Sequence, residues 1–431
     1  MSVELLLGLI ALFGMAAIGT PVAFSILVGV IVYLGVAGQD LAIAGQTTVQ
    51  RLFDGFLLLA VPLFIVSANI MNAGSISDRL LNFCIAVVGR FRGGMGHVNV
   101  VASLIFSGMS GSAVADAAGI GKIIIEMMVK SGKYTCGYAA AITAATATIG
   151  PIIPPSIPMV IYALVSGASI KDLFLGGIIP GLFMGMVLMG LNVFMSHRRG
   201  FGREDPVPLR DLPKLTVQAT PALLMPFILL FCLYSGITTP TEAAAIAALY
   251  ALVIAAGLYR AIKLKTLYQV FVDSARAAAS VGLVIGASMI LTYIVVQENI
   301  PQALSATLDG ANIHPLVFLL LINVMVLLLG CILDATVIIL VIVPLFIPTC
   351  EALGIDLVHF GVLIVVNSMI GLITPPYGIL LFVINAVTGI PLKEIIGEIW
   401  AFLGVLLLAL LVMILVPDIV LWLPSLLGYQ E

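Results

Sequence analysis

Charged residues are scarce in this sequence. Lysine and arginine number 18 and aspartate and glutamate 21 among 431 residues, which makes 9% charged against 62% hydrophobic. Soluble domains carry about 25% charged residues, so this chain lacks the polar surface that water requires. Apolar runs of roughly 18 residues or more recur along it, each long enough to cross about 30 Å of hydrocarbon. The composition therefore predicts an all-α polytopic membrane protein.

Several chemical signatures are also missing. The five cysteines form no close pair, and the four histidines are scattered. Neither HExxH nor a GxxxxGK[ST] phosphate loop occurs, so zinc hydrolases and P-loop ATPases are excluded and we do not expect an enzyme. No basic tract predicts a nucleic-acid partner. The first apolar run, 4–38, lacks the features of a secretory signal, and we expect it to be retained.

One long polar stretch interrupts the apolar pattern. In residues 197–214, eight of eighteen residues are charged and three are proline. We interpret 197–215 as a cytoplasmic linker between two membrane halves, 1–196 and 216–431. Residues 149–155 (IGPIIPP) match 370–376 (IGLITPP) at five of seven positions. Further markers recur in the same order: Gly19-Thr-Pro with Thr238-Thr-Pro, Asp116 with Asp334, and Gly167…Lys171-Asp172 with Gly389…Lys393-Glu394. Shared order, with the prolines preserved, predicts a duplication.

The first half is expected to cross the membrane five times. We predict spans at 3–19, 21–36, 55–73, 135–167 and 172–196, with a re-entrant hairpin at 98–130 and a break inside 135–167. An odd number of crossings turns the second half upside down, which gives two inverted-topology repeats. We also predict interfacial helices at 41–53, 76–92 and 264–277.

Basic residues indicate the orientation, because cytoplasmic loops are rich in Lys and Arg. With the N-terminus in the periplasm and the linker in the cytoplasm, 16 of the 18 basic residues lie on the cytoplasmic side. Arg51 and Lys171 are the two on the outside. The first hairpin is then expected to open from the cytoplasm and the second from the periplasm.

Four Gly/Ser/Pro clusters are candidates for the functional site. Non-helical backbone is tolerated inside a bilayer where protein or a water-filled cavity covers it. We expect hairpin tips at 107–112 and 330–336, and helix breaks at 150–155 and 371–376, since each Pro-Pro pair interrupts a helix. Helix ends at a break expose carbonyl oxygens, which suit a cation, and N–H groups, which suit an anion.

The pairing of one tip with one break predicts a Na⁺ site in each half, so at least two Na⁺ ions. Site 1 is predicted to consist of Ser107, Ser110, Gly111, Ser112, Gly150 and Ile153. Site 2 is predicted to consist of Gly330, Asp334, Thr336, Gly371 and Thr374. The predicted substrate-binding residues are Ser110, Ser112, Ser156, Asp334 and Tyr377. Ser156 and Tyr377 follow the two proline pairs directly and are expected to start half-helices.

Alternative interpretations exist for these clusters. Gly and Ser in membrane helices also serve close packing between helices. A carboxylate in mid-membrane costs roughly 2.5–3.5 kcal/mol, so Asp334 is expected either to bind a ligand or to make an interhelical hydrogen bond. Asp116 is placed nearer the base of its hairpin, and its role, as a ligand or as a structural group, is left open. Three rival classes are a channel, an intramembrane enzyme and a pure scaffold. A channel would favour a continuous polar lining or a symmetric filter, an enzyme needs a nucleophile with a base or metal ligands, and a scaffold would not need two duplicated ion sites.

Four sequence motifs resemble the large membrane subunit of TRAP transporters, the DctM-like family. They are Gly111-Ser-Ala-Val-Ala-Asp116, Pro154-Pro-Ser-Ile-Pro-Met-Val-Ile-Tyr162, Ser169-Ile-Lys-Asp-Leu-Phe174 and Pro180-Gly-Leu182. The resemblance covers nearly the whole chain and implies a multi-pass protein of the bacterial inner membrane. It implies Na⁺-driven uptake by an elevator mechanism, in which we place the transport domain at about 95–167 and 311–390 and the scaffold in the remainder. Positions that match the family's motifs carry its binding role to Ser110, Ser112 and Ser156.

The resemblance also implies partners and a substrate class. The partners are a small four-helix membrane subunit (Q type) and a periplasmic substrate-binding protein (P type), within membrane lipid. The chain shows no additional fused spans, so we expect the small subunit to be a separate polypeptide. Substrates in the family are organic anions such as C4-dicarboxylates, sialic acids and other sugar acids. The alternative is a Na⁺-coupled anion transporter of related fold that works without a binding protein.

Overall fold

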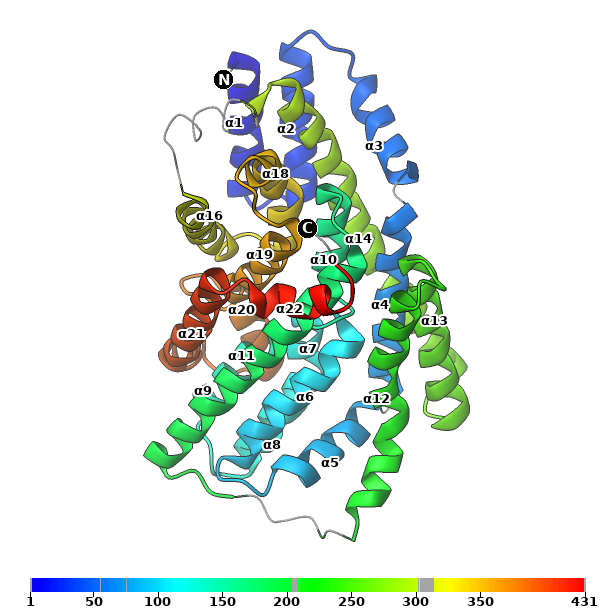
Figure 1. Cartoon of the computed structure of the whole chain (residues 1–431), viewed down its shortest axis with the longest axis vertical. Helices are drawn as coiled ribbons and strands as arrows, with labels where there is room; N and C mark the ends of the chain where they lie inside the picture. Colours follow the sequence, from blue (N-terminus) through cyan, green and yellow to red (C-terminus); the bar gives the residue numbers. More distant parts are fainter. Residues whose placement is uncertain are drawn as a thin grey trace.

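The computed structural model describes residues 2–54, 56–74, 76–203, 208, 210–300, 302 and 314–429, and these residues form helices and no strands (Figure 1). The first half contains α1 (Val3–Ala17), α2 (Val22–Val36), α3 (Ala42–Asp54), η1 (Phe56–Leu59), α4 (Ala60–Ala73), α5 (Ile76–Val88), α6 (Gly94–Ser110), α7 (Ala113–Asp116), η2 (Ala117–Gly121), α8 (Lys122–Lys130), α9 (Cys136–Ala147), α10 (Ile157–Ser166) and α11 (Ile170–Arg199). The second half contains α12 (Leu212–Tyr234), α13 (Pro240–Leu252), η3 (Val253–Leu258), α14 (Leu264–Gln297), α16 (Pro315–Gly330), α17 (Ala335–Val337), η4 (Ile338–Ile342), α18 (Val343–Ala352), α19 (Leu357–Gly371), α20 (Ile379–Thr388), α21 (Leu392–Leu415) and α22 (Asp418–Leu426). Part of the predicted linker lies outside the described residues.

Helix length and composition fit a polytopic membrane protein. Within the described residues, six helices are long and apolar enough to cross a bilayer. They are Ile170–Arg199, Leu212–Tyr234, Pro240–Leu258, Leu264–Gln297, Ala335–Ala352 and Leu392–Leu415. Seven shorter apolar helices accompany them. The N-terminus and the C-terminal end of α11 lie at opposite ends of the molecule (Figure 1), as the predicted topology requires; which end faces the cytoplasm stays a prediction.

The helices pack in two groups. In one, α4 contacts α13 and α14, α14 contacts α2 and α3, and α12 contacts α5 and α13. In the other, α9 contacts α6, α8 and α21, while α11 contacts α6, α19, α21 and α22. Thus α11 and α21, which lie outside the ranges predicted for the transport domain, pack directly against the hairpins and broken helices. The domain boundaries themselves stay predictions.

The two halves contain the same order of elements at their centres. In the first, α6 is followed by α7, the π-helical turn η2 and α8, and then by α9 and α10. In the second, α16 is followed by α17, the π-helical turn η4 and α18, and then by α19 and α20. The hairpins at 98–130 and 315–352 and the two broken helices therefore form as helix pairs. The inversion of one half relative to the other stays a prediction.

Two of the predicted interfacial helices are separate helices, α3 and α5. Helix α5 is bent by 73° away from α4. The third prediction, at 264–277, is wrong, because these residues are the first part of the 34-residue helix α14. The segment Ala277-Ala-Ala-Ser-Val281 contains neither Gly nor Pro, so nothing interrupts the helix where its charged part meets its apolar part.

An aromatic cluster anchors the start of the linker to the hairpin base. The Phe201 side chain is buried, with ring centroids 4.9 Å from Tyr134 and 4.8 Å from Tyr138. The Gly93 N–H donates to the Gly202 carbonyl at 3.0 Å, and the Lys133 ammonium donates to the Arg203 carbonyl at 2.7 Å. These contacts hold residues 201–203 against the loop before α6 and the loop after α8.

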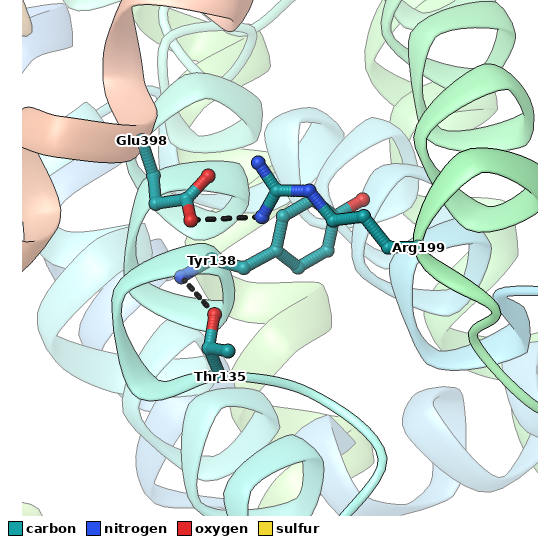
Figure 2. A network of polar contacts seen from close by, with 4 residues as sticks. All are labelled: Thr135, Tyr138, Arg199 and Glu398. Atoms are coloured by element: carbon teal, nitrogen blue, oxygen red, sulfur yellow. Dashed lines mark hydrogen bonds and ion pairs between the residues drawn. The ribbon is translucent and has the colours of Figure 1, made fainter.

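Beside this cluster, α11 is joined to α21. The Arg199 guanidinium donates to the Glu398 carboxylate at 2.8 Å and lies 5.7 Å from the Tyr138 ring (Figure 2). The Thr135 hydroxyl caps α9 by accepting the Tyr138 N–H at 3.3 Å. The end of α11 is therefore connected to one helix from each half.

Replacing Phe201 with alanine is expected to lower the thermal unfolding midpoint of the detergent-purified chain. Removing a buried phenylalanine costs about 3–5 kcal/mol, because apolar contacts are lost and a cavity remains. The matched control is Phe194→Ala on α11, where the ring is 61% exposed. Equal midpoints for the two variants would show that Phe201 does not anchor the linker.

Candidate functional site

The first hairpin turns sharply at two residues. Helix α6 ends at Ser110, and Gly111 has φ +59°, a left-handed conformation that favours glycine. The Ser112 hydroxyl then accepts the Ala115 N–H at 3.4 Å and caps α7. This places the tip inside the predicted range 107–112.

The tip of this hairpin lies directly against the first helix break. A Cβ on Gly111 would stand 2.5 Å from the Pro155 carbonyl oxygen, so only glycine permits this approach. Ser156 starts α10, as predicted, because its hydroxyl accepts the Met159 N–H at 3.2 Å and donates to the Pro151 carbonyl. The Pro154-Pro155 and Pro375-Pro376 bonds are both cis. Tip 1 and break 1 thus form one unit.

Asp116 lies at this junction, and its expected position near the hairpin base is wrong. Its side chain is 3% exposed, and a Cβ on Gly150 would stand 2.3 Å from Asp116 Oδ2. The Ser110 hydroxyl donates to Asp116 Oδ1, whereas Oδ2 has no hydrogen-bond partner among the described residues. Only the one-turn helix α7 separates Asp116 from Ser112 at the tip, so the carboxylate stays near the tip instead of lying at the base of the hairpin. The break therefore contacts a buried carboxylate with one unused oxygen.

The second tip and break are in backbone contact. A Cβ on Gly371 would stand 2.7 Å from both the Cα and the carbonyl carbon of Gly330. The Gly378 N–H donates to the Cys331 carbonyl at 3.3 Å. Asp334 caps α17, since its Oδ1 accepts the Thr336 N–H at 2.9 Å. The predicted site 2 therefore brings Gly330 and Gly371 together.

Buried amides join each hairpin to its broken helix. In the first half, Asn99 donates to the Thr143 hydroxyl at 2.6 Å and accepts from the Thr146 hydroxyl at 3.0 Å. In the second half, the Asn367 amide nitrogen donates to the backbone and side-chain oxygens of Asn323 at 2.6 and 2.8 Å. Asn367 Oδ1 has no partner among the described residues. Buried polar groups of this kind hold the helices in one register.

A cavity of about 300 Å³ lies between the two tips. From the first tip it is lined by Ser110, Gly111 and Ser112, and from the second by Asp334 and Thr336. The opposite wall comes from α4 and α14 and includes Asn69, Ala277 and Val281. Elements far apart in the sequence therefore form one chamber of the size that small ligands use.

Several of the predicted site residues do not line this cavity. Ser107, Gly150, Ile153, Ser156, Gly330, Gly371, Thr374 and Tyr377 do not line it. The Ser107 hydroxyl donates to the Leu104 carbonyl within α6 at 2.6 Å, and the Thr374 hydroxyl donates to the Ile370 carbonyl at the end of α19 at 2.8 Å. Tyr377 is 58% exposed and lies beside Phe382. It does not start α20, because Gly378 (φ +51°) is the N-cap of that helix.

Sequence reasoning missed the wall opposite the hairpins. Asn69 lines the cavity from α4, and its side chain donates to the Ser274 hydroxyl on α14 at 2.9 Å. An Asn within an apolar helix was the available signal, because a polar side chain in hydrocarbon needs a partner. The number of residues between Asn69 and the hairpins in the sequence does not indicate that they are in contact.

Comparisons with known proteins agree with this architecture. The model of the family "Tripartite ATP-independent periplasmic transporter, DctM component" matches residues 9–419. The sialic acid TRAP transporter large permease protein SiaM of Vibrio cholerae is 38% identical, over 97% of this chain and 98% of its own length. The C4-dicarboxylate TRAP transporter large permease protein DctM of Vibrio cholerae is 34% identical over 98% of both chains. The 2,3-diketo-L-gulonate permease YiaN of Escherichia coli is 35% identical over 97% and 98%.

A solved structure shares the fold. The YdaH transporter of Alcanivorax borkumensis superposes with a TM-score of 0.63, covering 85% of this chain and 86% of its own. At 15% sequence identity this likeness concerns the fold alone. The curated relatives are permeases rather than enzymes, and the chain is a multi-pass membrane protein. It belongs to the DctM family of large permease subunits of tripartite ATP-independent periplasmic transporters.

Proposed function

We propose that the chain takes up an organic anion across the bacterial inner membrane, coupled to Na⁺, by an elevator movement. The observation that supports this most is the cavity between the two hairpin tips, because each tip abuts a helix break of its own half. Relatives named for sialic acid, C4-dicarboxylate and 2,3-diketo-L-gulonate define the range of substrates. The small membrane subunit and the periplasmic binding protein complete the transporter.

Two Na⁺ ions bind, one at each tip and break. Site 1 uses the residues named above together with Asp116, whose buried Oδ2 supplies a negative charge without another partner. Carboxylate, hydroxyl and carbonyl oxygens are the donors that hard cations prefer. At site 2, Asp334 has the same role beside the Gly330–Gly371 contact. Substrate binds between the two sites, in contact with Ser112 and Asp334.

Movement occurs between the two packing groups. The hairpins, the broken helices and the helices packed on them (α11 and α21) slide past α4 and α14, which form the fixed wall of the cavity. Substrate and ions stay enclosed while the cavity changes sides. This is the elevator form of alternating access around a mid-membrane site.

Uptake into proteoliposomes is expected to require a Na⁺ gradient and to increase with an inside-negative potential. Each positive charge that moves inward gains about 2.3 kcal/mol per 100 mV, and two Na⁺ with a monoanion carry one net charge. The measurement is uptake of radiolabelled acid, with Na⁺ or choline outside and a potassium diffusion potential. Equal accumulation in Na⁺ and choline would overturn the proposed coupling.

The same assay tests the alternative without a binding protein. Uptake by the two membrane subunits is measured with and without a soluble substrate-binding protein. Dependence on that protein fits the tripartite arrangement. Full uptake in its absence would identify the chain as a transporter that takes substrate directly.

A further inference from the structure

The substrate cavity is unevenly charged. Asp334 lines it from the second tip, and none of its lining residues within the described part of the chain is Lys, Arg or His. The first tip contributes the hydroxyls of Ser110 and Ser112. Asp334 is exposed, and the buried acid nearby, Asp116, does not line the cavity. An anion in this space therefore meets a carboxylate on one wall and hydroxyls on the other.

Two hydrogen-bond acceptors that line the cavity are available to a ligand. One belongs to Asp334, and the other belongs to Asn69 on the wall formed by α4 and α14. Asp334 Oδ1 accepts the Thr336 N–H, and Oδ2 makes no hydrogen bond within the described part of the chain. The Asn69 amide nitrogen donates to Ser274, which leaves its carbonyl oxygen as an acceptor. Both residues line the same cavity. A ligand group at this end must donate hydrogen bonds, as a hydroxyl or an N–H does.

We propose that the cavity selects acids with one carboxylate and several hydroxyl or N–H groups, and that Asp334 rejects a second carboxylate. The inference rests on the proposed function and narrows its substrate class from organic anions to hydroxylated monocarboxylates. A second carboxylate adds a negative charge beside Asp334 in a cavity whose described lining residues include no basic side chain. Like charges held close together at a protein surface repel more strongly than in bulk water, and a carboxylate that loses water without gaining a cationic partner is destabilised.

Bound Na⁺ does not remove this preference. The ions of the two sites are present with either kind of acid, so they contribute equally to both. The Na⁺ nearest the second carboxylate is the one at site 2. Because Asp334 and this ion together carry no net charge, no positive charge remains there to pair with a second carboxylate. A site built for dicarboxylates would therefore need a further cation, and its binding would depend more steeply on Na⁺.

Matched pairs of acids test the proposal directly. D-Gluconate and D-glucarate share one carbon skeleton and differ in a terminal hydroxymethyl or carboxylate; glycerate and tartronate form a shorter pair. The measurement is the shift in thermal unfolding midpoint of the full chain in detergent, as a function of acid concentration, in saturating NaCl or choline chloride. For each pair that binds, we expect the monocarboxylate to shift the unfolding midpoint at a concentration at least tenfold lower than its dicarboxylate does. We expect these shifts in NaCl and not in choline chloride.

Two variants test the part that Asp334 has. Asp334→Asn keeps the size of the side chain and removes its charge. The ratio of the effective concentrations of dicarboxylate and monocarboxylate in each pair is therefore expected to fall toward one. Asp418→Asn removes an exposed carboxylate at the start of α22 and is expected to leave the ratio unchanged. If the Asp334→Asn variant binds neither acid, the concentration ratio measured for the wild-type chain decides whether the proposal stands.

The outcomes separate the inference from the proposed function. The inference is overturned, and the proposed function stands, if the dicarboxylates bind as tightly as the monocarboxylates or more tightly in the presence of Na⁺. The same conclusion follows if no monocarboxylate binds and succinate binds in a Na⁺-dependent way. A full tenfold ratio in Asp334→Asn would also overturn it. The absence of a Na⁺-dependent shift with every acid would overturn both.

Discussion

Replacing Gly371 with valine is expected to abolish Na⁺-dependent uptake while the chain still inserts into the membrane. The new Cβ would stand 2.7 Å from Gly330 backbone atoms, a distance that no side-chain rotation relieves because both groups are fixed to the backbone. Relief requires the second tip and break to separate by several tenths of an ångström or more. Small displacements of positioned ligands cost far more than their size suggests, so we expect at least a hundredfold loss of uptake.

Gly404→Val on α21 is the matched control. This glycine is exposed, and a Cβ there would meet nothing within 4 Å. Uptake is measured in proteoliposomes with equal amounts of each variant, and folding is followed by size-exclusion chromatography. Near-normal uptake by Gly371→Val would mean that the contact between Gly330 and Gly371 is dispensable for the site.

Replacing Asp116 with alanine is expected to raise the Na⁺ concentration for half-maximal uptake at least a hundredfold. The carboxylate is buried at the first break, and Oδ2 is left without a protein partner. Its loss removes the negative charge from site 1 and leaves the Ser110 hydroxyl without its acceptor. Hydrogen bonds to a charged group contribute about 1.5–3 kcal/mol, so the hydroxyl network weakens together with the ion site.

The control is Glu126→Ala on α8, in the same hairpin. Glu126 is exposed and pairs with Lys130 at 3.4 Å, a surface contact worth about 0–1 kcal/mol. Na⁺ titrations of uptake by both variants give the comparison. An unchanged Na⁺ dependence in Asp116→Ala would assign this carboxylate to packing rather than to ion binding.

Much of the site could be predicted from local sequence. Short Gly/Ser/Pro clusters indicate where a helix ends, and the structure has hairpin tips at Gly111 and at residues 331–334, inside the predicted ranges. Ser156 caps a half-helix as expected, because its hydroxyl accepts the N–H of Met159, three residues further along the chain. These features depend on neighbours within one helical turn.

Other features depend on contacts between distant segments, and these could not be predicted. Asp116 meets Gly150 because the first tip packs against the first break, a contact between segments that are not neighbours in the sequence. Asn69 reaches the cavity through the packing of α4 against the hairpins. Tyr377 corresponds to Ser156 in the sequence repeat, yet Gly378 begins the next helix, so equal spacing did not produce equal caps.

The buried amides give the two halves unequal stiffness. In the first half, both polar atoms of the Asn99 side chain are used by Thr143 and Thr146, so the hairpin and its broken helix are joined by a complete network. In the second half, Asn367 keeps an unused buried oxygen. An unsatisfied buried acceptor costs about 1–3 kcal/mol, and local opening starts where the cost of separation is lowest. We therefore expect the second hairpin to separate from its broken helix more readily than the first, so that brief exposure of the cavity begins at this hairpin.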